Sequence, residues 1–263
     1  MSFECTPDFA YDTDATITQA NELWRRLDRP NVMIKVPGTI PGIRAIEELT
    51  RSGVNVNVTL LFALERHEAV AEAYLRGLTR RAEEGGPLEH ICSVASFFLS
   101  RIDTEADALL DRSSPLRGRA AVASARVAYQ HYLRDFSGAR WERLRSLGAR
   151  PQRLLWASTG TKDPAYSDVR YVEQLVGPDV ISTMPEQTLE AFAAHGEIAP
   201  TLEADPAQAA ADLAALQAEG IDLASLTATL EHRGVELFCA SYRDLLTCLN
   251  RRIEALGGAR REG

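Results

Sequence analysis

A lysine in the middle of an apolar stretch is the first residue of this sequence that could do chemistry. Lys35 lies in NVMIKVPGT, residues 31–39, where Val32, Ile34 and Val36 are typical of a buried strand. An ammonium group is costly to bury without a partner. Burial disfavours the charged form, and a neutral amine can attack a ketone, lose water and form a Schiff base. The alternative is a lysine at a strand end that reaches solvent and has only a structural role.

Polar residues in two further strand-like stretches could assist such a lysine. Asn57 and Thr59 are two residues apart in VNVNVTLLF, so their side chains share one face of a strand. The amide could hold a substrate hydroxyl, and the hydroxyl could position the water that forms and hydrolyses an imine. Glu4, in the N-terminal SFECT, could exchange protons with that water. The alternatives are a half-solvated strand face for Asn57 and Thr59 and simple exposure for Glu4.

Candidates for binding an anion follow two later strands. Arg101 comes after the apolar SVASFFLS, at the expected carboxyl end of its strand. Ser158 and Lys162 occupy the corresponding end of the next strand, in WASTGTKDP. A hydroxyl-rich loop with a glycine and one lysine could bind a phosphate. Taken singly, each of these residues also fits an ordinary loop or a surface ion pair.

These residues are placed by strands and helices that alternate over about the first 195 residues. The sequence predicts six strands, at residues 2–6, 31–36, 54–62, 91–99, 153–158 and 179–182. Helices are predicted from about Asp14, over the apolar positions of 43–49, over 65–84, around 103–111 and 119–147, and from about Pro185. From about residue 206, leucine-rich periodicity predicts three consecutive helices separated by Gly220 and Gly234.

Repeated strand–helix units predict an α/β fold with a parallel sheet. No strand leads into a Gly-x-Gly-x-x-Gly loop, which disfavours a dinucleotide-binding sheet. Polar residues inside the strands, including Ser96, suit a (β/α)₈ TIM-type barrel, whose inward positions reach the active-site mouth. Six strands make that barrel incomplete. We expect residues 1–200 to form the partial barrel and residues 201–263 a helical segment packed on it.

Composition narrows the classes of partner. The net charge of −8 argues against a general nucleic-acid binder but leaves room for a small anionic substrate. No apolar run is long enough for a membrane span. The four cysteines and five histidines lack metal-ligand spacing. We therefore expect a soluble, cytoplasmic protein with no metal and no cofactor, and a homodimer is left open.

Five stretches of the sequence resemble the transaldolase family in its longer bacterial form. They are NVMIKVPGT, GVNVNVTLLF, ICSVASFFLSRIDTEAD, RLLWASTGTKDPAYSD and VISTMPEQTLEAF, in the family's order over nearly the whole chain. The resemblance implies a (β/α)₈ barrel enzyme of the pentose phosphate pathway that uses a Schiff-base lysine and no metal. Its reaction moves a dihydroxyacetone unit from sedoheptulose 7-phosphate to glyceraldehyde 3-phosphate, giving erythrose 4-phosphate and fructose 6-phosphate.

The resemblance also implies roles for single residues. Lys35 corresponds to the Schiff-base lysine, and Glu4 to a glutamate that works with the catalytic water. Asn57 and Thr59 correspond to a pair that contacts substrate and helps to position that water. The remaining matches are a substrate-contacting serine at Ser96, phosphate-binding residues at Arg101 and Ser158, and a looser basic equivalent at Lys162.

The match begins at the family's third strand. The first two strands, and with them the aspartate that is the family's acid/base group for carbon–carbon bond cleavage, have no counterpart in the sequence. Three explanations are open: a start that lies upstream of Met1, a shortened chain without full activity, or a second polypeptide that supplies the segment. The first two are favoured. We expect little turnover from these residues alone, and the alternatives are a sugar-phosphate-binding remnant or an enzyme of specialised sugar biosynthesis.

Overall fold

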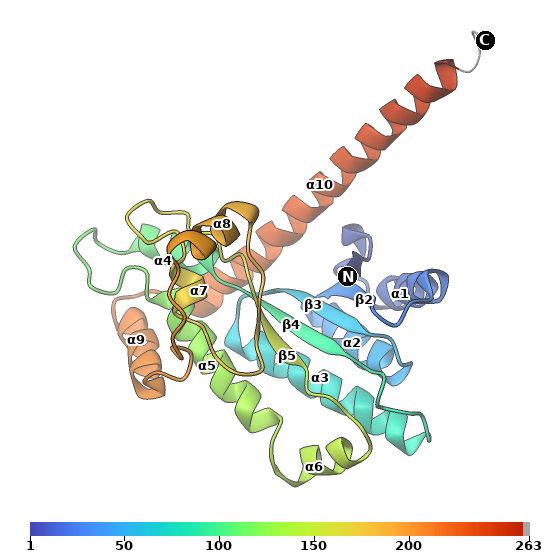
Figure 1. The fold of residues 1–263 in the computed structure, drawn as a ribbon, viewed down its shortest axis with the longest axis horizontal. Coiled ribbons are helices and arrows are strands. Elements are labelled where there is room, and N and C mark those ends of the chain that lie inside the picture. Colours follow the sequence, from blue (N-terminus) through green and yellow to red (C-terminus); the bar gives the residue numbers. More distant parts are fainter. Residues whose placement is uncertain (260–263) are drawn as a thin grey trace.

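Six parallel strands in sequential order form the centre of the molecule (Figure 1). The computed structural model describes residues 1–259. The strands are β1 (Ser2–Glu4), β2 (Met33–Pro37), β3 (Val56–Leu61), β4 (Ser93–Phe98), β5 (Arg153–Ala157) and β6 (Ile181–Ser182). Neighbours in sequence are neighbours in the sheet, which is the strand order of a TIM-type barrel. All six predicted strands are confirmed, and within residues 1–259 β1 and β6 form the two edges of the sheet.

The two faces of the sheet differ in their cover. Ile34 and Val36 of β2 are fully buried, while Met33, Lys35 and Pro37 between them are partly exposed. The same alternation appears in β5, where Leu154 and Trp156 are buried. Since alternate side chains point to opposite faces of a sheet, one face packs under the helices and the other is partly open. Lys35 belongs to the open face.

Ten α-helices and one short 3₁₀ helix surround the strands within the described residues. They are η1 (Pro7–Phe9), α1 (Thr13–Leu27), α2 (Ile40–Arg51), α3 (Leu64–Glu83), α4 (Ser100–Leu109), α5 (Ala120–Asp135), α6 (Gly138–Ser146), α7 (Arg170–Glu173), α8 (Glu186–His195), α9 (Pro206–Ala218) and α10 (Leu223–Ala259). Those that follow the first strands lie beside the sheet, and α10 projects away from it (Figure 1). The short helix α7 was not predicted, since four residues are too few for a periodic signal.

The prediction of three C-terminal helices is wrong, because the second and third are one continuous helix, α10. Gly234 lies inside it rather than between two helices. A Cβ atom at Gly234 would lie 2.9 Å from Cδ2 of Leu60, a residue of β3. The glycine therefore allows the helix to approach the sheet closely, at the modest cost that glycine has inside a helix.

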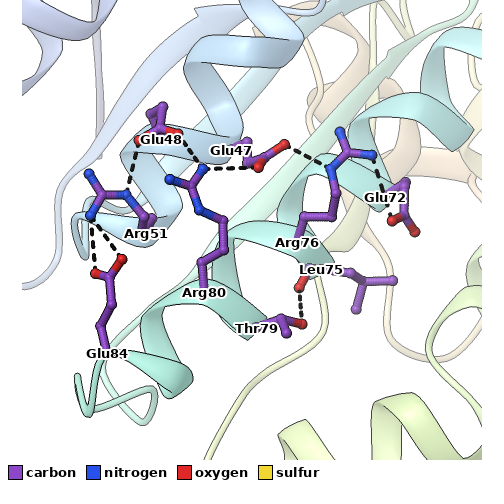
Figure 2. A network of polar contacts seen from close by, with 9 residues as sticks. All are labelled: Glu47, Glu48, Arg51, Glu72, Leu75, Arg76, Thr79, Arg80 and Glu84. Atoms are coloured by element: carbon purple, nitrogen blue, oxygen red, sulfur yellow. Dashed lines mark hydrogen bonds and ion pairs between the residues drawn. The ribbon is translucent and has the colours of Figure 1, made fainter.

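Charged side chains tie α2 to α3 on the outside of the molecule. Figure 2 shows Glu47 of α2 accepting hydrogen bonds from Arg76 and Arg80 of α3, at 2.8 and 3.0 Å. Arg51 of α2 reaches Glu84, just beyond α3, at 3.0 Å. The arginines are 32–46% exposed, so water and salt screen these pairs. The network therefore adds little to the stability of the fold.

The C-terminal helices share a core with the sheet. Leu216 of α9 and Leu226, Leu230 and Val235 of α10 belong to the same buried cluster as the strand residues. Beyond this contact, the apolar residues of α10 from Leu245 to Leu256 are at least 42% exposed. In residues 1–259, no helix combines the length and apolar character that a membrane span requires. The division into residues 1–200 and 201–263 stays a prediction, and residues 260–263 lie outside the described part.

Candidate active site

Three adjacent strands place one residue each in a row across the open face of the sheet. Parallel pairing sets Glu4 of β1 beside Lys35 of β2, and Lys35 beside Asn57 of β3. The Nζ atom of Lys35 lies 2.7 Å from Oε1 of Glu4. The lysine side chain is 25% exposed and that of the glutamate 47%, so the pair joins the pocket to solvent. The lysine thus has the partner that its apolar surroundings demand.

Thr59 lies one step further along β3, next to Pro37 of β2. It lines a small pocket together with Glu4 and Lys35. The residue is 3% exposed, and its hydroxyl finds no hydrogen-bond partner within residues 1–259. A buried hydroxyl without a partner is uncommon and costs free energy. This group is therefore available to a water or a substrate atom at the lysine.

The side chain of Asn57 is held by hydrogen bonds at both ends. Its Nδ2 donates to Oγ of Ser2 at 2.9 Å, and its Oδ1 accepts from Oγ of Ser96 on β4 at 2.8 Å. These two bonds hold the amide between β1 and β4. Asn57 and Ser96 thus belong to one hydrogen-bonded arrangement that links β1, β3 and β4 across the open face. Their contact with substrate stays a prediction.

The thiol of Cys5 lines the same pocket as Lys35. Burial, with a smaller contribution from the charge of Glu4, raises the pKa of Cys5 to about 12. The thiol is therefore protonated and a poor nucleophile at neutral pH, since the thiolate is the reactive form.

A second group of candidates lies where β4 and β5 end. Ser158, which follows β5, has a left-handed backbone conformation with φ of +54°. Its Oγ lies 2.9 Å from Oγ of Ser100, and its carbonyl accepts a hydrogen bond from the Ser100 amide. Arg101 is the next residue, in the first turn of α4, and is half-buried. Among residues 1–259 its guanidinium has no hydrogen bond or ion pair, so it is free to hold an anion.

Lys162 lies apart from these groups. It is exposed and lines a hollow between α4 and the loop after β5, together with Asp103 and Asp107. Both carboxylates already accept hydrogen bonds. Asp103 accepts from the Ala121 amide at 2.8 Å and from the Tyr171 hydroxyl at 2.8 Å. Asp107 accepts from the Gly118 amide at 2.8 Å and from the Tyr166 hydroxyl at 2.6 Å. The structure thus connects Lys162 to this acidic hollow and not to Ser158, and its predicted role in phosphate binding stays a prediction.

Sequence reasoning did not find the residues of α10 and β3 that cover Lys35. Val235 and Phe238 of α10 and Leu60 of β3 line the pocket. Leu60 has φ of +58°, in a stretch where the pairing of β3 with β4 shifts register. Such strain is typical of functional sites, but it depends on the tertiary contacts and leaves no mark in the sequence. The signal that could have located α10 is Gly234, a glycine within a helical pattern.

Known proteins of one family match this chain over most of its length. The family model for transaldolase/fructose-6-phosphate aldolase matches residues 1–249. The chain belongs to this family. The transaldolase of Thiobacillus denitrificans is 49% identical over 251 residues, which cover 94% of this chain and 70% of the relative. The transaldolase of Mycolicibacterium smegmatis is 48% identical over 261 residues, covering 97% and 70%.

A third relative, transaldolase 1 of Streptomyces avermitilis, is 49% identical over 252 residues, covering 94% of this chain and 67% of the relative. The chain therefore spans about 70% of the length of these transaldolases. Membership confirms the predicted family, the α/β fold of barrel type and an enzyme of the transaldolase type. Within residues 1–259, no group of three or more histidine, cysteine, aspartate or glutamate side chains could hold a metal ion.

Proposed function

We propose that this chain forms a Schiff base between Lys35 and a ketose phosphate and transfers a dihydroxyacetone unit to an aldose phosphate. The expected substrates are those that the family resemblance implies, sedoheptulose 7-phosphate and glyceraldehyde 3-phosphate, with no cofactor. The observation that carries the proposal is one pocket with three features: a lysine amine, a carboxylate at 2.7 Å and a buried hydroxyl without a partner.

The formation and the hydrolysis of the imine use groups of this pocket. Glu4 accepts the proton of the Lys35 ammonium, and the free amine adds to the ketone carbon. Water leaves and the imine forms. A base removes the proton from the hydroxyl on the departing carbon, the protonated imine takes up the electron pair of the breaking carbon–carbon bond, and an aldose departs while a three-carbon enamine stays on Lys35. The family resemblance gives this role to the aspartate that has no counterpart in the sequence, which is the reason that we expect little turnover. The enamine then adds to the acceptor aldehyde, and water held by Thr59 hydrolyses the new imine.

The phosphate of either sugar would lie at the ends of β4 and β5. Arg101 offers a guanidinium without a counter-ion in the described residues, and Ser158 a hydroxyl. Arginine suits this role because its planar fork matches phosphate oxygens. Asn57 and Ser96 lie on β3 and β4, the strands between β2 and β5, and we expect them to contact the hydroxyls of the substrate.

Borohydride trapping can assign the covalent step to a single residue, because the sequence contains only two lysines, Lys35 and Lys162. We expect fructose 6-phosphate with borohydride to add one reduced three- or six-carbon unit at Lys35. The Lys162→Arg variant should be trapped like the wild type, and Lys35→Arg should give no adduct. Peptide mass spectrometry measures the site. An adduct at Lys162, or transfer activity that survives Lys35→Arg, would contradict the proposal.

Trapping and transfer are measured separately. Our expectation of little turnover from these 263 residues is checked by the rate of erythrose 4-phosphate formation by the purified chain. Efficient turnover would overturn it. Sugar phosphate binding without an adduct would favour the alternative of a binding protein, and an adduct with other ketoses only would favour specialised sugar biosynthesis.

The hydroxyl of Thr59 gives a prediction in which stability and function separate. Thr59→Val replaces a buried, unpartnered hydroxyl by a methyl group of similar size. We expect the free energy of unfolding to stay the same or rise by about 1 kcal/mol, because a desolvated polar group is removed. Hydrolysis of the unreduced imine should slow at least about tenfold, on the order expected for a lost proton-transfer or water-positioning group. Urea unfolding and the decay of the unreduced adduct measure the two effects, and a destabilised variant with normal decay would contradict both.

A further inference from the structure

Helix α10 is fastened across the pocket by ion pairs to three different elements. Glu231 pairs with Arg66 of α3 at 3.2 Å, Arg233 with Glu105 of α4 at 3.0 Å, and Arg243 with Asp8 of η1 at 2.8 Å. The Glu231 pair is the most buried, with side chains 14% and 24% exposed. The other two pairs are 40–69% exposed and contribute little. The helix is held chiefly by the Glu231 pair, by its buried apolar residues in the shared core and by the close approach of Gly234 to Leu60.

This attachment places an aromatic ring over the reactive amine. The ring centroid of Phe238 lies 5.5 Å from Nζ of Lys35, within the range of a cation–π contact. Phe238 and Val235, three residues earlier, both line the pocket. Lys35 has Glu4 on one side and Phe238 on another, so the ring shields one side of the amine while the side of the carboxylate stays open to solvent.

We propose that Phe238 is a specificity residue that decides whether the three-carbon unit is transferred or released. This inference rests on the proposed Schiff base at Lys35. After bond cleavage the enamine has two fates. It can add to an aldehyde carbon, which forms a carbon–carbon bond and an alkoxide that takes a proton. It can instead take a proton on carbon, after which water hydrolyses the imine and releases dihydroxyacetone and the free amine of Lys35.

Both fates end with the hydrolysis of an imine, so the choice is made at the enamine carbon. The ring favours the first fate because it occupies the space from which a water would deliver a proton to that carbon. An aldehyde that is held by its phosphate at Arg101 and Ser158 approaches from the ends of β4 and β5 and not through α10. Removal of the ring should therefore raise the rate of release without a matching change in transfer. The two rates depend on the same adduct, so their ratio does not change when part of the protein is unfolded.

The experiment compares Phe238→Ala and Phe238→Leu with Leu237→Ala, a change of an adjacent residue of α10 that is 50% exposed. We expect the ratio of released dihydroxyacetone to transferred unit to rise about tenfold in Phe238→Ala, with Phe238→Leu in between and Leu237→Ala unchanged. An unchanged ratio in Phe238→Ala would overturn the inference while leaving the Schiff base intact.

A second measurement needs no turnover. Formaldehyde with cyanoborohydride methylates lysine amines, and Lys162 serves as an exposed internal reference. In the free protein, Phe238→Ala should raise the methylation of Lys35 relative to Lys162 severalfold, and Leu237→Ala should not. If the ketose never forms an adduct with the wild type, the proposed function fails, but this ratio still reports the cover over Lys35. Equal ratios in all variants would show that Phe238 does not shield the amine.

Discussion

Replacement of Glu4 by glutamine is expected to slow the formation of the Lys35 adduct by a factor on the order of 10² to 10⁴, the usual contribution of a proton-transfer group. The Glu4 carboxylate lies 2.7 Å from the amine and is the charged group in position to accept its proton. Glutamine keeps the shape and the hydrogen bond but cannot accept a proton. The measurement is the rate of borohydride-trappable adduct at saturating fructose 6-phosphate.

Two further variants make this result specific. Glu4→Asp retains the carboxylate and should recover part of the rate, and Glu190→Gln, on the exposed side of α8, should leave the rate unchanged. Because Glu4 is half exposed, its ion pair adds little to stability, so the unfolding midpoint of Glu4→Gln should stay close to that of the wild type. A Glu4→Gln rate within about twofold of the wild type would exclude Glu4 from proton transfer.

Two buried titratable groups are expected to change stability in opposite directions on acidification. Burial lowers the pKa of His67, on α3, to about 4 from 6.5, with a further contribution from nearby His131. The folded protein therefore resists protonation of His67, and stability falls as the pH drops from 6.5 towards 4. Burial also raises the pKa of Asp103 to about 6 from 3.8, against hydrogen bonds from Ala121 and Tyr171. This group makes the folded protein less stable as the pH rises through 6.

Each effect amounts to about 2–3 kcal/mol between pH 7.5 and pH 4.5, so the two largely cancel in the wild type. Single variants separate them. Relative to the wild type, His67→Gln should gain stability at pH 4.5 compared with pH 7.5, and Asp103→Asn should lose it. Free energies from urea unfolding at both values of pH measure the change.

The double variant His67→Gln with Asp103→Asn provides the control. It should return to the pH dependence of the wild type, because both opposing contributions are gone. Single variants whose pH dependence matches that of the wild type would show that neither group changes its proton affinity on folding.

The strands and their polar residues were predictable from the sequence because the signal is local. Lys35 interrupts an alternating apolar pattern, and Asn57 and Thr59 are two residues apart on a strand, so a shared face follows from strand geometry alone. Parallel pairing in sequential order then brings Glu4, Lys35 and Asn57 into one row. Arg101 and Ser158 were likewise predictable as residues at strand ends, where barrel ligands bind.

The sequence by itself thus determined the order of the strands, the face on which Lys35 lies and the family to which the chain belongs. Only the tertiary structure decided what covers the lysine, because Phe238 is more than 200 residues away in the sequence and is brought to it by the packing of α10 on the sheet. It also decided that Gly234 lies inside a helix, since the close approach to Leu60 outweighs the tendency of glycine to end one. Local patterns fix strands and faces, whereas contacts between distant segments fix the cover of the active site.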